Sequence, residues 1–255
     1  YLQQLFTTVS NTTYTCEFWK VSKLRKWVDS NCKNKKIGKS ASFNVIDRSK
    51  DYPADGNGAN QFTERSVVAA LKNPTLGTVF QLAANDSVAY TWCNGRSHAG
   101  YIVTNTKLGK AIRSDKKFKN IKDLNQLFEY TSSPKYLNYE GSYAIANNTV
   151  CLNSVGEADN PDNIYIAVFK DLQTVNTPSQ EINVVLTAAY PGGVAAAESK
   201  YPGKGKEVLK NCLTTGYDGI LLSAIMMNKP DVILTFIGGH AFKGIPNDTI
   251  EAIEN

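Results

Sequence analysis

Short apolar runs bounded by turn residues predict four buried strands, at residues 78–84, 165–169, 182–187 and 232–237. The last of these is rich in β-branched side chains, which favour strands. Apolar residues at helical spacing predict a long helix over 207–227 and a short one over 247–253. A strand, a long helix and a further strand form a βαβ unit, whose strands are parallel. We therefore expect an α/β domain with a sheet that is at least partly parallel.

The start of the chain carries a helical pattern of its own. Phe18, Val21, Leu24, Trp27 and Val28 recur every three or four residues, with basic residues between them. The pattern breaks between residues 31 and 39. We therefore divide the chain into an N-terminal helical extension, residues 1–40, and a larger domain, residues 41–255.

Composition changes this interpretation little. Hydrophobic residues make up 42% of the chain, an ordinary share for a globular core. The net charge is +5, and basic residues gather at 20–39 and 107–122, which could contact an anionic surface. A solvated helix face is the favoured interpretation, and aromatics are not interleaved as in nucleic-acid binders, so we expect no nucleic-acid partner. The longest apolar runs, 220–227 and 232–239, are too short for a membrane span.

The sequence offers few residues for a metal site or for thiol chemistry. Five widely spaced cysteines form no CxxC pair, and His98 and His240 are the two histidines. We expect no metal site, no cofactor, and reduced thiols in an intracellular setting. The chain also has no GxSxG elbow and no Walker loop. Cys93 lies near His98 in sequence, but a Cys–His pair alone does not indicate a thiol hydrolase.

Candidate chemistry gathers where predicted strands end. The strand at 232–237 runs into Gly238 and Gly239, whose backbone N–H groups could approach phosphate oxygens closely, and Phe242 offers a flat face for a ribose or base. The strand at 78–84 delivers Asn85 and Asp86 to a loop, and the strand at 182–187 ends in small residues, Tyr190 and a glycine pair. Each could be a simple turn, but parallel strands share an edge, so all three could line one cleft.

These stretches resemble, in order, three pieces of the divergent macrodomain proteins related to poly(ADP-ribose) glycohydrolase. Residues 80–85 are similar to the macrodomain strand that ends in an Asn near the distal ribose. Residues 184–190 and the following helix, with Tyr217 and residues 221–224, are similar to the next strand–loop–helix. Residues 232–242 are similar to the strand and glycine loop around the diphosphate, and residues 250–253 fit the closing helix. The resemblance covers about the last three quarters of the chain, and residues 1–39 match nothing we can name.

The resemblance implies a three-layer α/β/α macrodomain-like sandwich with a mixed, largely parallel sheet and the N-terminal helical extension. It also implies a site for ADP-ribose. The residues expected to contact the ligand are Phe80, Gln81, Asn85, Gly95, Gly100, Tyr101, Ala189, Tyr190, Gly238, Gly239, His240, Ala241 and Phe242. The expected catalytic residues are Asp86, which would orient water, His98 as acid or base, and Asn94.

Three departures from the family pattern matter. The loop at 94–100 has two glycines where a glycine run is usual, and it lacks the paired glutamate of the poly(ADP-ribose) glycohydrolases. His240 stands where another glycine would be usual. The glutamate-acid mechanism therefore cannot be carried over.

The function that the resemblance implies is removal of ADP-ribose from a modified protein side chain, with arginine favoured. Such non-standard macrodomains occur among secreted effectors of intracellular bacterial pathogens, so secretion into the host cytosol, or a cytoplasmic location, is expected. The expected partners are ADP-ribose and an ADP-ribosylated protein, and the chain is expected to be a monomer. Two alternatives stay open: a module that binds ADP-ribose without cleaving it, and an effector that contacts a host protein and keeps a vestigial pocket.

Overall fold

A computed structural model describes a little under half of the chain. It covers residues 2–7, 13–32, 78–84, 105–114, 145–146, 149–150, 160, 164–175, 179–188, 190, 193–237 and 246–254. The strands are β1 Leu2–Thr7, β2 Thr13–Lys20, β3 Val79–Ala84, β4 Ile145–Ala146, β5 Thr149–Val150, β6 Tyr165–Gln173, β7 Glu181–Ala188 and β8 Val232–Ile233. The helices are α1 Val21–Asn31, α5 Lys107–Ser114, α8 Gly193–Lys200, α9 Gly205–Met227 and α10 Pro246–Glu254.

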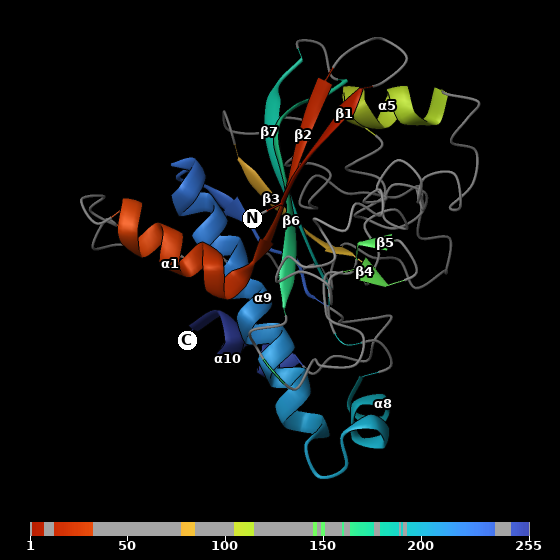
Figure 1. The fold of residues 1–255 in the computed structure, drawn as a ribbon, viewed down its shortest axis with the longest axis vertical. Helices are drawn as coiled ribbons and strands as arrows, with labels where there is room; N and C mark the ends of the chain where they lie inside the picture. Colours follow the sequence, from red (N-terminus) through yellow and green to blue (C-terminus); the bar gives the residue numbers. More distant parts are fainter. Residues whose placement is uncertain are drawn as a thin grey trace, which may run out of the picture.

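Six of these strands form one mixed sheet, in the order β1-β2-β6-β7-β3-β8 (Figure 1). β3 pairs in parallel with β7 on one side and β8 on the other, while β1, β2, β6 and β7 pair antiparallel in succession. The α/β class and the βαβ unit are therefore confirmed. The described part of the sheet is not largely parallel, because the antiparallel strands β1, β2 and β6 extend it beyond β7.

Helices α1, α9 and α10 form a layer on one face of this sheet (Figure 1). The core lies between that layer and alternate side chains of the strands, such as Ile166, Val168 and Val185. These three side chains are fully buried. Among the described helices, none is long and apolar enough to cross a membrane.

Helix α9 runs unbroken through Gly216 and Gly219, although each glycine lowers its intrinsic helix propensity. The reason is close packing. A Cβ added at Gly219 would lie 2.8 Å from Val21 Cγ2 and 3.1 Å from Ile166 Cγ2. Glycine at this position lets α9 lie directly on β6 and on the first turn of α1.

The carboxylate of Glu198 in α8 ties the loop before α9 to the N-terminus of α9. Its two oxygens accept hydrogen bonds from the backbone N–H groups of Gly203, at 2.5 Å, and Gly205, at 2.8 Å. These bonds lower the pKa of the Glu198 carboxyl, because they favour its charged form. Glu198 thereby satisfies the first free N–H of the helix, and the N-cap residue Lys204 makes no side-chain cap of its own.

The first residues of the chain join the sheet. A helix is confirmed at 21–31, but the predicted inclusion of Phe18 is wrong, because Phe18 lies in β2 and pairs with Ala167 of β6. Strand pairing overrides a helical spacing that continues across Lys20 by coincidence. The predicted boundary at residue 40 lies outside the described residues.

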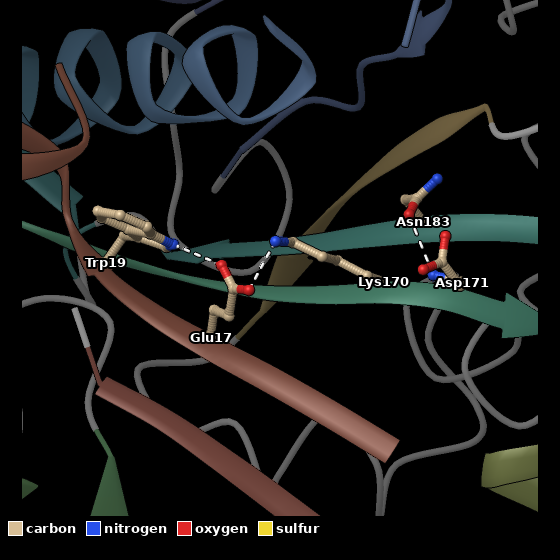
Figure 2. A network of polar contacts seen from close by, with 5 residues as sticks. All are labelled: Glu17, Trp19, Lys170, Asp171 and Asn183. Atoms are coloured by element: carbon tan, nitrogen blue, oxygen red, sulfur yellow. Dashed lines mark hydrogen bonds and ion pairs between the residues drawn. The ribbon is translucent and has the colours of Figure 1, made fainter. Parts of the chain in front are cut away.

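A partly buried ion pair joins β2 to β6. The Glu17 carboxylate accepts a 2.6 Å bond from Lys170 Nζ and a 2.9 Å bond from Trp19 Nε1 (Figure 2). Glu17 is only 7% exposed. Beyond Lys170, Asp171 adopts a left-handed φ of 55° at an irregularity in the β6–β7 ladder, and its N–H donates to Asn183 Oδ1. This network (Figure 2) anchors the N-terminal hairpin to the centre of the sheet.

Candidate functional site

Three parallel strands point toward the same edge of the sheet. The β3–β7 ladder runs to the pair Ala84 and Ala188, and β8 pairs with β3 at Val79 and Phe80. The prediction that these strands point the same way is therefore confirmed. In open α/β sheets, ligands bind beyond the carboxyl ends of such strands.

The third of these strands is shorter than the sequence predicts. The ladder of β8 stops at Ile233, whereas the apolar run continues to Ile237. Residues 234–237 have no strand partner among the described residues. Two side chains from other elements hold this segment instead.

Gln81 of β3 is the first. It is fully buried, and its Oε1 accepts hydrogen bonds from Thr235 N at 2.5 Å and Thr235 Oγ1 at 2.8 Å. Its Nε2 donates to Thr187 Oγ1 of β7 at 3.1 Å. One carboxamide therefore links β3 to β7 and to the segment that follows β8, where the backbone ladder has ended.

Tyr217 of α9 is the second. Its ring is fully buried, and its hydroxyl donates to Thr235 O at 2.8 Å and accepts from Ile237 N at 3.1 Å. Both hydrogen-bonding functions of the phenol are thus used on backbone atoms two residues apart. We call Gln81, Tyr217 and the segment 235–237 the stem clamp.

The environment of the phenol keeps it neutral. Burial raises the pKa of Tyr217 to about 12, and the hydrogen bond from Ile237 N opposes this rise. The hydroxyl of Thr249 in α10 also lies close enough to oppose it. Within the described part of the chain, however, Thr249 Oγ1 forms no well-aligned hydrogen bond. Tyr217 therefore remains a donor at Thr235 O throughout the physiological range.

Helix α9 comes close to the strand ends at the residue before Tyr217. A Cβ added at Gly216 would lie 3.6 Å from Ile237 Cδ1 and 4.0 Å from Thr187 Cβ, which is ordinary contact. Between the two clamped residues, Phe236 is 40% exposed, whereas Ile237 is buried against the helical layer. The clamp therefore leaves the ring of Phe236 partly exposed two residues before Gly238 in the chain.

The structure places three of the predicted ligand-contacting residues. Phe80 and Gln81 are fully buried, and the amide of Gln81 is engaged in the stem clamp. Tyr190 follows β7 and is 9% exposed, with its ring edge-on to Tyr201 at 6.3 Å. Burial raises the pKa of the Tyr190 phenol, and the thiol of Cys212 adds to the rise. All three side chains pack inside the protein, so their expected contact with a ligand stays a prediction.

The other predicted site residues lie outside the described residues. They are Asp86, Asn94 and His98 among the catalytic candidates, and Asn85, Gly95, Gly100, Tyr101, Ala189, Gly238, Gly239, His240, Ala241 and Phe242 among the binding candidates. Within the described ranges, no three His, Cys, Asp or Glu side chains gather as metal ligands would.

Sequence reasoning missed Tyr217 as a site residue. The resemblance to macrodomains included Tyr217 only as one residue of the long helix, because a tyrosine in an amphipathic helix is usually a core residue. The signal that distinguishes it is tertiary: its hydroxyl reaches backbone atoms 18 and 20 residues further along the chain.

Comparisons with known proteins agree on the fold. No protein-family model matches the sequence, and no curated protein matches it. Solved structures do match. Poly(ADP-ribose) glycohydrolase from Thermomonospora curvata superposes with a TM-score of 0.50 at 11% identity, over 97% of this chain and 79% of that one. The Deinococcus radiodurans enzyme in complex with ADP-ribose gives 0.50 at 9% identity, over 94% of this chain and 80% of that one. The T. curvata enzyme with the inhibitor ADP-HPD bound gives 0.50 at 11% identity, over 97% and 78%.

At this level of identity the likeness establishes the fold. The predicted resemblance to proteins related to poly(ADP-ribose) glycohydrolase is therefore confirmed for the architecture of the chain. The similarity extends beyond the last three quarters that the sequence indicated, because the matched region includes nearly all of this chain.

Proposed function

We propose that this chain, with its poly(ADP-ribose) glycohydrolase fold, is an ADP-ribosylhydrolase. The observation that carries the proposal is the match over 97% of the chain to a glycohydrolase of that fold. The stem clamp supports it, because it fixes a strand end directly before a glycine pair at the edge where ligands of α/β sheets bind. In this proposal Gly238, Gly239, His240 and Phe242 hold the diphosphate and distal ribose, and Asn85 holds ribose hydroxyls.

The proposed reaction is hydrolysis of the glycosidic bond between ADP-ribose and its acceptor. The bond from the anomeric carbon to the acceptor atom breaks through a transition state resembling an oxocarbenium ion. Water then bonds to the anomeric carbon, one of its protons passes to a base, and the departing acceptor gains a proton. Asp86 is our candidate for orienting the water and His98 for the acid–base step, with Asn94 beside them in the sequence.

We further propose that the acceptor is a protein side chain, with arginine favoured, and that the protein works as a secreted bacterial effector. Both finer points rest on the resemblance to effector macrodomains. A substrate panel tests the first: arginine-, glutamate- and serine-linked ADP-ribose on defined peptides, with release followed by mass spectrometry. Release from the arginine peptide alone is the expected result, and release from another acceptor would replace arginine in the proposal.

A second candidate function is binding of ADP-ribose without cleavage. The specific observation in its favour is that no two glutamates are adjacent anywhere in this chain, whereas the glycohydrolase family carries a pair near its active site. A binding module would keep labelled ligand intact over time, and a hydrolase would not.

Calorimetric titration with ADP-ribose tests the site first, with AMP and NAD as controls. Saturable binding of ADP-ribose is expected. Gly239→Glu places a negative charge and a side chain in the proposed diphosphate loop and should abolish binding, while Asp86→Ala should keep binding and lose turnover. Absence of binding by the wild-type protein at millimolar ADP-ribose would refute the proposed function and favour an effector that acts through protein contacts.

A further inference from the structure

We propose that Gln81 and Tyr217 are positioning residues for the diphosphate of the ligand. Neither side chain need touch it. They hold residues 235–237, the segment that directly precedes Gly238 and Gly239 in the chain. This inference rests on the proposed function for the identity of the ligand, and on the described contacts for the clamp itself.

The clamp replaces a missing strand ladder. Among the described residues, the ladder between β8 and β3 pairs Val232 with Val79 and Ile233 with Phe80 and then ends, so no ladder fixes the backbone that follows. Two residues after the ladder ends, Gln81 Oε1 accepts a hydrogen bond from Thr235 N. This bond ties Thr235 to β3. Because Nε2 of the same amide donates to Thr187, its orientation is fixed from both sides.

Tyr217 holds the same segment from the helical layer. Its hydroxyl bonds on either side of Phe236, to the carbonyl of Thr235 and the N–H of Ile237. Two bonds from one rigid aromatic side chain fix the course of the backbone across three residues. The helix that carries it is itself fixed, because Gly219 lets α9 lie against Ile166 and Val21.

The clamp should affect ligand binding because hydrogen bonds are directional. A backbone N–H binds a phosphate oxygen well only within a narrow range of distance and angle. In the proposed function the peptide groups after Ile237 bind the diphosphate. Tyr217 holds the N–H of Ile237, so losing that bond would let the backbone rotate there and change the direction of those groups. Loss of the clamp should therefore weaken diphosphate binding before it unfolds the protein.

The test combines amide hydrogen exchange with ligand binding on the full chain. Tyr217→Phe removes one hydroxyl, and Gln81→Met removes the carboxamide at nearly equal volume. The matched control is Ser223→Ala, which removes a buried hydroxyl from the same helix, where Ser223 Oγ donates to Gly219 O at 2.7 Å. Near-ultraviolet circular dichroism confirms that each variant is folded before comparison.

We expect faster exchange at Thr235 and Ile237 in both clamp variants, with the amides of β3 and β7 still protected. We also expect about a tenfold rise in the Kd for ADP-ribose, the loss that one buried hydrogen bond represents. Ser223→Ala should leave both the exchange at 235–237 and the Kd as in the wild type. Should Gln81→Met not fold, Tyr217→Phe alone carries the comparison.

The outcomes separate this inference from the proposed function. Wild-type protein that protects Thr235 and Ile237 but binds no ADP-ribose would overturn the proposed function, and with it the ligand named here. Unchanged exchange in Tyr217→Phe would overturn the clamp. Faster exchange with an unchanged Kd, or an equal rise in Kd for Ser223→Ala, would overturn the positioning role.

Discussion

Helix α9 lies closer to its neighbours at Gly219 than at Gly216, one turn away. We therefore predict opposite effects on stability when each of these glycines is replaced by alanine. Replacing Gly with Ala inside a helix stabilises it by about 0.8–1.0 kcal/mol, because alanine loses less conformational entropy. At Gly216 the added Cβ would find its nearest neighbour at 3.6 Å, so Gly216→Ala should show most of that gain. At Gly219 the Cβ would meet Val21 Cγ2 at 2.8 Å, well inside the usual carbon–carbon contact of about 3.5–4.0 Å.

The side chains around Gly219 cannot yield easily. Val21 and Ile166 are β-branched and buried, so neither has a free rotamer to move into. Overpacking of this kind costs about 1–3 kcal/mol. The helix-propensity gain is shared by both variants and cancels in their difference. Gly219→Ala should therefore be less stable than Gly216→Ala by about 1–3 kcal/mol, which corresponds to roughly 2–4 °C in Tm per kcal/mol for a chain of this size.

Urea unfolding followed by far-ultraviolet circular dichroism measures the difference. The two variants should share one m value and differ in midpoint, since each exposes the same surface on unfolding. Equal midpoints for Gly216→Ala and Gly219→Ala would refute the reasoning, because α9 would then not lie against β6 and α1 as closely as described.

Three further predictions follow from other contacts. Glu17→Ala removes the counter-charge of the partly exposed Lys170 and the acceptor of Trp19 Nε1, so urea unfolding should show a loss of about 1–3 kcal/mol, and Glu17→Ala with Lys170→Met should cost less than the sum of the two single changes. Glu198→Gln leaves one acceptor for the two N–H groups of Gly203 and Gly205. Because the folded pKa of Glu198 lies below its ordinary value of 4.5, its contribution is present above that pH and lost as the pH falls through the folded value. Wild type and Glu198→Gln should thus differ in Tm at pH 7, and the gap should close as the pH falls below 4.5; a constant gap would contradict the assignment. Burial raises the pKa of Cys212 to about 12, so iodoacetamide at pH 8 should leave it unlabelled in native protein and label it in urea, as peptide mass spectrometry would show.

The sequence by itself determined about half of the described helices and strands. Apolar runs placed β3, β6 and β7, and helical spacing placed α9 and α10, because burial of alternate or every third to fourth side chain leaves a periodic trace in the chain. The same periodicity misassigned Phe18. This residue lies three positions before Val21, so the helical spacing continues across the boundary between β2 and α1. It also extended β8 to Ile237, because an apolar run shows burial but not whether a partner strand continues beside it.

Only the tertiary structure decided what holds the strand ends. Gln81 is separated by 106 residues from Thr187 and by 154 from Thr235, and they become neighbours because β3 lies between β7 and β8 in the sheet. In the sequence, Gln81 is a polar residue in an apolar strand and was assigned to ligand contact. In the fold it is buried with both ends of its amide engaged. Nothing in the sequence indicated that the hydroxyl of Tyr217 has a structural role. The backbone atoms that hydrogen-bond to it become its neighbours only after α9 packs on the sheet. Local periodicity fixes where apolar side chains go, whereas a buried polar group is defined by partners distant in sequence that only the folded chain supplies.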